Sequence, residues 1–92
     1  MKIRIEGEKQ KETKITLEGE GHTFCNVLQS ALLGDEGVEF VGYNVPHPLK
    51  SEATIYVRVK KGSPKEALHK AAEFIRKQTD EFQKTWKEAI GA

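Results

Sequence analysis

The stretch "SPKEALHKAAEFIRKQTDEFQKTWKEAI", residues 63–90, decides the fold of this chain. Its first letters predict a helix start, because Ser63 can cap the helix, Pro64 suits its first turn and Glu66 completes a capping box. The pattern predicts one uninterrupted helix that runs to about Ile90. Roughly 27 residues at 1.5 Å each give a helix about 40 Å long.

The predicted helix has two different faces. Apolar residues continue almost to the chain end, at Leu68, Ala72, Ile75, Phe82, Trp86 and Ile90. The opposite face is charged and consists of Glu66, Lys70, Glu73, Lys77, Asp80 and Lys84. On this face acidic residues are followed by lysine four positions later, which is the favourable order for ion pairs within a helix. The helix is therefore amphipathic over its whole length.

Upstream of this helix, four segments alternate apolar and polar residues and predict strands. They lie at residues 2–6, 13–18, 38–45 and 53–60. In the third segment the alternation begins on Val38 and Phe40. It then shifts to Val41 and Tyr43, so we expect a β-bulge near Gly42.

A shorter helix is predicted between the second and third strands. Its apolar residues follow the spacing of one helix face and are Phe24, Val27, Leu28, Ala31 and Leu32. We expect Thr23 to cap the start of this helix and Gly34 to end it.

These elements predict an α+β fold with the order strand, strand, helix, strand, strand, helix. A chain of 92 residues has no room for a second hydrophobic core, so we expect a single domain over residues 1–92. The expected sheet is four-stranded and mainly antiparallel, with both helices on one face. Such a sheet is about 20 Å wide at a strand spacing of about 4.8 Å, so the last helix should overhang its own domain.

The overhang allows two arrangements. The amphipathic helix could pack entirely on its own sheet, but the geometry leaves Phe82 and Trp86 short of cover. Alternatively, these side chains are buried against another chain, where aromatic anchors are over-represented. We expect the second arrangement.

The charge balance of the chain argues against one class of function, the direct binding of nucleic acid. The formal net charge is +1; residues 1–49 carry 5 basic and 8 acidic residues, and residues 50–92 carry 10 and 6. A domain that binds nucleic acid through its own phosphate contacts usually has a stronger basic excess. Tyr43 and Tyr56 could stack bases, but the element order is not that of an RNA-recognition module. We expect both tyrosines to pack on the sheet.

The chain lacks the marks of a secreted or membrane protein. No apolar run approaches the roughly 18 residues needed to cross a bilayer. The charged and alternating segment at residues 1–20 does not resemble a signal or transit peptide. Cys25 is the only cysteine, which excludes an internal disulfide and a cysteine zinc cluster. We expect a reduced, soluble, cytoplasmic protein.

Groups that could carry catalysis are few. His22 and Cys25 form an H-x-x-C step, but a metal site would also have to recruit His47. A histidine at a loop end and a buried thiol are the simpler interpretation. Cys25 has no evident base beside it, and His69 lies near the edge of the charged helix face. We expect no catalytic, metal-binding or cofactor-binding residues and no cofactor.

Two segments carry a family resemblance: "EGEGHTFCNVLQSALL", residues 18–33, and "VEFVGYNVPHPL", residues 38–49. Together with the "SPKEAL" helix start, they closely resemble the family of archaeal DNA-directed RNA polymerase subunit L. That family includes the eleventh subunit of eukaryotic polymerase II and is related to the N-terminal domain of the bacterial α subunit. The resemblance covers essentially the whole chain. It departs from the family at Gly21, where aspartate is common, and at Cys25, where glycine or alanine is usual.

The resemblance implies a non-catalytic assembly subunit of the polymerase. It would form a heterodimer with its related half in the archaeal enzyme, the subunit designated D, which we call the D-type subunit. Both helices would lie in the interface. The pair would act as a platform for the large catalytic subunits, aided by small zinc-binding subunits.

On this basis the expected interface residues are Phe24, Leu28, Leu32, Phe74, Ile75, Phe82, Trp86 and Ile90. The resemblance also places a rigid structural turn between the third and fourth strands, formed by Pro46, His47 and Pro48.

Two other functions remain as alternatives to the assembly subunit. A small homodimeric nucleic-acid-binding module would show a strongly salt-dependent affinity of the isolated chain for DNA or RNA. A small enzyme would show turnover by the purified chain. The assembly subunit is expected to make no base-specific contact with nucleic acid and to have no membrane partner.

Overall fold

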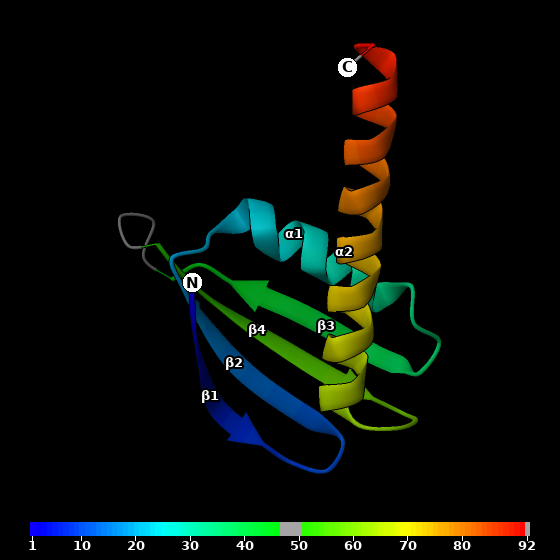
Figure 1. The fold of residues 1–92 in the computed structure, drawn as a ribbon. Coiled ribbons are helices and arrows are strands. Elements are labelled where there is room, and N and C mark those ends of the chain that lie inside the picture. Colours follow the sequence, from blue (N-terminus) through cyan, green and yellow to red (C-terminus); the bar gives the residue numbers. More distant parts are fainter. Residues whose placement is uncertain (47–50, 92) are drawn as a thin grey trace.

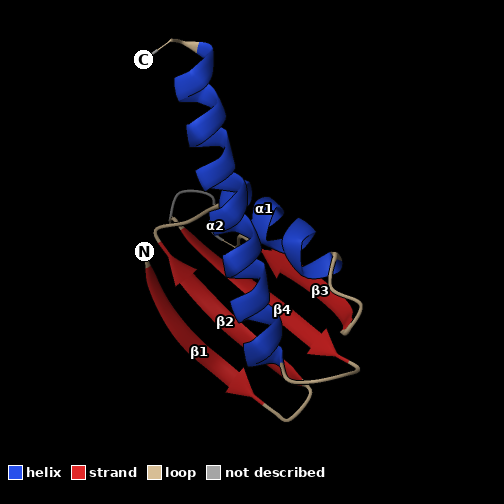
Figure 2. Cartoon of the chain, turned by 45° about the vertical axis from the view of Figure 1, so that its right-hand side comes forward, coloured by secondary structure: helices blue, strands red, loops and turns tan. Residues whose placement is uncertain are grey.

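The computed structural model describes residues 1–46 and 51–91. The chain forms β1 (Lys2–Glu8), β2 (Glu12–Glu18), α1 (His22–Leu33), β3 (Val38–Asn44), β4 (Glu52–Val59) and α2 (Pro64–Ala89). The strands make an antiparallel sheet in the order β1-β2-β4-β3, and both helices lie on the same face of it (Figures 1 and 2). The expected fold class and element order are confirmed.

The core lies between the sheet and the two helices. β4 is an inner strand, between β2 and β3. Every second side chain of β4 points toward the helices and is buried; these are Ala53, Ile55, Val57 and Val59. Ile55 stands opposite Ile15 of β2 and Tyr43 of β3. The alternation in the sequence therefore sets the buried face, because successive side chains of a strand point to opposite sides of the sheet.

Two irregularities shift the register of the outer strands. One lies in β1, just before Gly7. The other lies in β3 between Val38 and Phe40, so the expectation of a bulge near Gly42 was wrong. Because the extra residue absorbs one step of the alternation, Val38 and Val41 both face the helices.

α1 begins earlier than expected. It starts at His22, its N-cap is Gly21, and no side chain provides a cap hydrogen bond. Thr23 therefore lies inside the first turn, and the expectation that it caps the helix was wrong. The helix ends at Leu33 with Gly34 as its C-cap, as the sequence indicated. Its buried residues are Cys25, Leu28 and Leu32.

α2 has the predicted start and length. The backbone N–H of Glu66 donates to the Ser63 hydroxyl at 3.1 Å, and Pro64 occupies the first turn. The 26 residues of the helix span about 39 Å. Beyond Ile75 every described residue of the helix is exposed. Figure 2 shows this second half projecting past the sheet.

The charged face of α2 forms ion pairs other than those expected. Arg76 pairs with Glu73 at 2.9 Å and with Asp80 at 3.5 Å, in place of the lysines that the spacing favoured. The branched guanidinium can bind two carboxylates at once, which a lysine does less readily.

In the described part of the chain no helix is long and apolar enough to cross a membrane.

The expected turn at the end of β3 is only partly described. Pro46 follows β3 and is exposed. His47 and Pro48 lie outside the described residues, so the rigid turn stays a prediction.

Truncation of Ile55 tests the position of the core. Ile55 is fully buried, so Ile55→Ala should lower the free energy of unfolding by about 2–5 kcal/mol through lost burial and the cavity left behind. Lys14→Ala, on the exposed side of neighbouring β2, should change it by less than about 0.5 kcal/mol. Urea unfolding followed by circular dichroism, at one fixed protein concentration, measures both changes. If both variants lost the same unfolding free energy, Ile55 would not lie in the core.

Candidate partner interface

An apolar groove lies on the helix-bearing face of the sheet, over β1 and β2. α1 packs against β3, and α2 crosses β2 and β4 while it packs on α1. β1 is left without a helix above it (Figure 2). The resulting space between β1, α1 and the first half of α2 has a volume of about 520 Å³.

β1 provides the uncovered floor of the groove. Ile3 stands opposite Leu17, and Ile5 stands opposite Ile15, so both point to the same side of the sheet as the core. Ile3 and Ile5 are nevertheless 60% and 62% exposed, whereas Leu17 and Ile15 are buried. Two aliphatic side chains on the core side of the sheet thus lack cover from the part of the chain that the structure describes.

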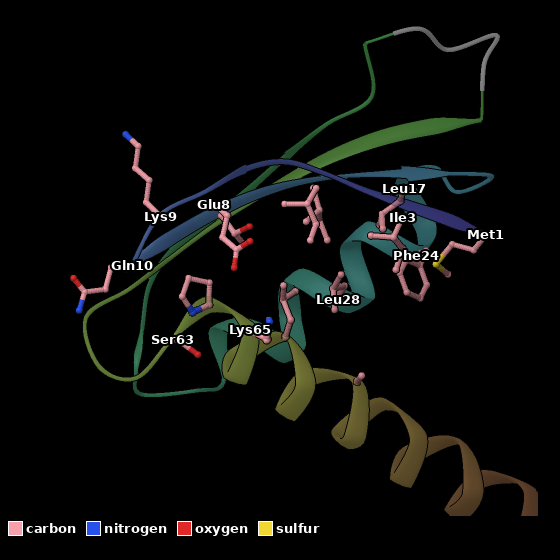
Figure 3. Close-up of a pocket in the computed structure, with 16 residues that line it drawn as sticks. Met1, Ile3, Glu8, Lys9, Gln10, Leu17, Phe24, Leu28, Ser63 and Lys65 are labelled. Atoms are coloured by element: carbon pink, nitrogen blue, oxygen red, sulfur yellow. The ribbon is translucent and has the colours of Figure 1, made fainter.

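The groove is apolar at one end and polar at the other. Figure 3 shows Met1, Ile3 and Leu17 near Phe24 of α1, with Leu28 further along the groove. The opposite end is lined by the polar residues Glu8, Lys9, Gln10 and Ser63. Apolar contact surface bordered by polar residues is typical of protein–protein interfaces.

One wall of the groove is α2, whose apolar side continues beyond the sheet. Leu68 and Ala72 line the groove. Ile75, Phe82 and Trp86 follow at steps of three, seven and four residues, which keeps them on the same side of the helix. The groove and the free part of the helix therefore form one surface. We call it the apolar strip; it comprises Met1, Ile3, Ile5, Phe24, Leu68, Ala72, Ile75, Phe82, Trp86 and Ile90.

Phe82 and Trp86 are the aromatic residues of the free part of α2. Their rings stack, with centroids 6.5 Å apart and planes 8° apart. They are 69% and 55% exposed. Leaving such large apolar side chains in water costs free energy, and the same residue types act as anchors where two proteins meet.

The charged face of α2 differs from the apolar strip in its electrostatics. A hydrogen bond from Arg76 to the Glu73 carboxylate lowers the pKa of Glu73 and raises the pKa of Arg76. Both groups therefore stay charged at neutral pH. They are exposed, and exposed ion pairs contribute little to stability. This face of the helix is suited to contact with water.

The structure divides the residues expected in the interface into three groups. Exposed on α2 or at its C-cap are Phe74, Phe82, Trp86 and Ile90. Half-buried against the edge of the core are Phe24 and Ile75. Buried in the core of the chain are Leu28 and Leu32. Leu28 still lines the groove, but Leu32 does not, so Leu32 can act on a partner only by supporting α1 from within.

Sequence reasoning missed the contribution of β1. The alternation of Ile3 and Ile5 shows that they share a face of the strand. It cannot show that both helices lie over the other strands. The relevant fact is that β1 is an outer strand, and this depends on the order of the strands in the sheet.

The residues considered for metal binding or catalysis are kept apart. In the described ranges no group of three or more potential metal ligands comes together. Cys25 is buried, and burial raises the pKa of its thiol, which makes it less reactive. The exposed His22 lies with its Nδ1 3.2 Å from the hydroxyl of Tyr43, which donates to Asn26. His47 lies outside the described residues.

Residues 12–85 match the family model described as the RNA polymerase Rpb3/Rpb11 dimerisation domain. The chain is 46% identical over 77 residues to DNA-directed RNA polymerase subunit Rpo11 of Methanothermobacter thermautotrophicus, covering 84% of this chain and 88% of that relative. It is 32% identical to Rpo11 of Methanosarcina barkeri over the full length of both chains. RPB11 of RNA polymerase II from Schizosaccharomyces pombe is 45% identical over 62 residues, which cover 66% of this chain and 50% of the relative.

A solved structure shares the fold. Subunit L of DNA-directed RNA polymerase from Thermoplasma acidophilum gives a TM-score of 0.87, with coverage of 98% of this chain and 89% of that chain. Sequence identity is 22%, so this likeness is one of fold. The element order and the long last helix thus have a counterpart in that subunit.

The apolar strip predicts self-association of the isolated chain. Because Phe82 and Trp86 lack cover, the purified chain should form concentration-dependent oligomers that bury them. Replacing both by Ser should shift the population toward monomer, whereas Lys77→Ser on the charged face should not. Sedimentation velocity over a wide range of concentration measures the distribution. A wild-type chain that stays a folded monomer at every concentration would contradict the expectation.

Proposed function

Since the chain belongs to the RNA polymerase Rpb3/Rpb11 dimerisation domain family, we propose that it pairs with the D-type polymerase subunit through the apolar strip. The chain is a small subunit of DNA-directed RNA polymerase, of the Rpb11 family. Its part in transcription is therefore played within a multisubunit enzyme. In this proposal the heterodimer is the platform on which the large catalytic subunits assemble.

One observation carries the proposal: the second half of α2 has an apolar side that no described residue of its own chain covers. A helix of this length in water gains most of its stability from the packing of its apolar side. The free part projects past the sheet (Figure 1), so the cover has to come from another molecule. The D-type subunit is the proposed source of that cover.

The groove over β1 suits the same partner. A partner of related fold carries a long helix of its own, and the groove is an apolar channel that can receive one. A helix that lies in a groove buries the residues spaced three and four apart on one side. In this arrangement each chain covers the helix of the other. The proposed contact residues are those of the apolar strip together with Leu28, which lines the groove, and the exposed Phe74.

The remaining roles in this proposal are those that the family resemblance implies. Catalysis and template contacts belong to the large subunits, and small zinc-binding subunits join the platform. The expected turn at Pro46, His47 and Pro48 serves the structure of the single domain and carries no chemistry. The assembled enzyme works in the cytoplasm.

Co-expression with the D-type subunit tests the pairing. The two chains should purify as a stable one-to-one complex, measured by size-exclusion chromatography with light scattering. Replacing Ile3 and Ile5 by Asp places two carboxylates in the groove and should abolish the complex, because burying unpaired charge is costly. Arg4→Gln, on the other side of the same strand, is the control and should leave pairing intact. A wild-type chain that ignores the D-type subunit would refute the proposal.

Trp86 should contribute more to the complex than any charged residue of α2. Trp86→Ala loses buried area and leaves a hole, which costs roughly 2 kcal/mol or more for an interface anchor. Lys77→Ala removes an exposed side chain from the charged face and should change the affinity little. The two variants should therefore differ more than about tenfold in Kd, which titration calorimetry measures. If Lys77→Ala raises the Kd as much as Trp86→Ala does, the charged face of α2 contacts the partner.

A further inference from the structure

The sheet face without helices carries a second organised surface. Phe40 of β3 stands opposite Arg58 of β4, and Tyr56 lies two residues before Arg58 on the same face. Their neighbours Val57 and Val59 point the other way and are buried under the helices. We call Phe40, Tyr56 and Arg58 the aromatic–arginine platform.

Contacts between neighbouring strands hold this platform in place. The Arg58 guanidinium lies 5.9 Å from the ring centroid of Phe40 and 5.7 Å from that of Tyr56. The Tyr56 hydroxyl donates to the Glu12 carboxylate and accepts from Arg58 Nη2 at 3.2 Å. Cation–π contacts and cross-strand pairs of this kind order side chains before any partner arrives.

Gly42 provides the space in which the Phe40 ring lies. A Cβ at Gly42 would come within 3.3 Å of two ring carbons of Phe40, Cε1 and Cζ. The ring therefore lies across the glycine, yet Phe40 stays 49% exposed. A large aromatic side chain that is already ordered loses little conformational entropy when a partner covers it.

Arg58 can bind a further carboxylate. At the other end of the same face, Arg4 pairs with three carboxylates, those of Glu6, Glu18 and Glu52. Among the described residues Arg58 pairs with one, that of Glu12, and its Nη1 has no hydrogen-bond partner. A carboxylate on another molecule is complementary to that donor, because guanidinium groups bind carboxylates in a fork geometry.

The platform borders an unprotected edge of the sheet. β3 is an outer strand, and within the described residues it pairs with β4 alone. Residues 40–44 carry no charge. The opposite outer strand, β1, carries charges at Lys2, Arg4, Glu6 and Glu8. Charges of this kind protect edge strands from pairing with other chains, and residues 40–44 lack them.

We propose that an extended segment of a polymerase subunit other than the D-type subunit pairs with the β3 edge, with an acidic side chain on Arg58 and an apolar side chain on Phe40. The inference rests on the proposed function, in which the D-type subunit occupies the helix-bearing face and leaves this face free. Main-chain hydrogen bonds along β3 supply affinity, and the platform selects the sequence of the added strand.

A nucleic-acid strand suits this surface less well than a polypeptide. Aromatic rings and arginine can stack bases. However, the pKa of Arg58 is raised first by its hydrogen bond with Tyr56 and further by the nearby carboxylates of Glu12 and Glu39. These two carboxylates would repel phosphates. An acidic polypeptide can direct one carboxylate at Arg58 and keep the rest of its chain away from these two.

Hydrogen exchange tests strand addition directly. The heterodimer with the D-type subunit is compared with the polymerase reconstituted from all of its subunits. Amides within residues 40–44 should exchange at least about tenfold more slowly in the assembled enzyme, since added main-chain hydrogen bonds protect them. The charged outer strand β1 should show no comparable change. Unchanged exchange in residues 40–44 would overturn the proposal.

Variants of the platform test which side chains select the partner. Heterodimers with Phe40→Ala or Arg58→Gln should bind the remaining polymerase subunits at least about tenfold more weakly than the wild type. Arg4→Gln is the matched control, because its side chain lies on the same face and is exposed to a similar degree, 50% against 46%. It should change the affinity by less than about twofold.

Sizing of each variant with the D-type subunit separates this inference from the proposed function. Normal pairing with that subunit and weak binding of the remaining subunits support the inference. Normal binding of both kinds of partner by Phe40→Ala and Arg58→Gln would refute it. Loss of pairing with the D-type subunit would place the platform in the dimer interface, and loss of template binding with intact assembly would assign it to nucleic acid. Either of these results would also overturn the inference.

Discussion

The structure depends on one mismatch of size: α2, with 26 residues, is longer than the sheet and helix on which it packs. Its first half closes the core together with α1, and its second half has an apolar side that residues 1–46 and 51–91 leave uncovered. A free helix of that length is marginal in water on its own. Binding of a partner to the second half of α2 should therefore also stabilise its helical conformation.

The same mismatch organises the rest of the molecule. Because α1 and α2 lie over β2, β4 and β3, the first strand keeps its aliphatic side chains uncovered, and these extend the surface that begins on α2. The opposite face of the sheet has a different character. It carries the ion pairs of Arg4 at one end and the aromatic–arginine platform at the other. A chain with two such faces can contact two partners at once, as the proposed assembly role requires.

The features that the sequence predicted well are those set by local pattern. Alternation located the strands and the buried side of β4, and the Ser63 cap located the start of α2. The position of the β3 bulge was missed, since the bulge is defined by pairing with β4 and the alternation alone allows two positions. The cap of α1 was missed because Gly21 provides no side chain to recognise. Ile3 is exposed and Leu32 is buried because of which strands the two helices cross. Local periodicity does not show which strands those are.

Trp86 is the only tryptophan of the chain, so it offers a direct test of whether α2 docks on the D-type subunit. The chain labelled with 5-fluorotryptophan would give one fluorine NMR signal, whose sensitivity to solvent can be measured before and after addition of the unlabelled D-type subunit. The account predicts that the signal shifts, loses its solvent sensitivity and saturates at one equivalent of that subunit. A one-to-one complex in which the signal keeps its position and its solvent sensitivity would contradict it.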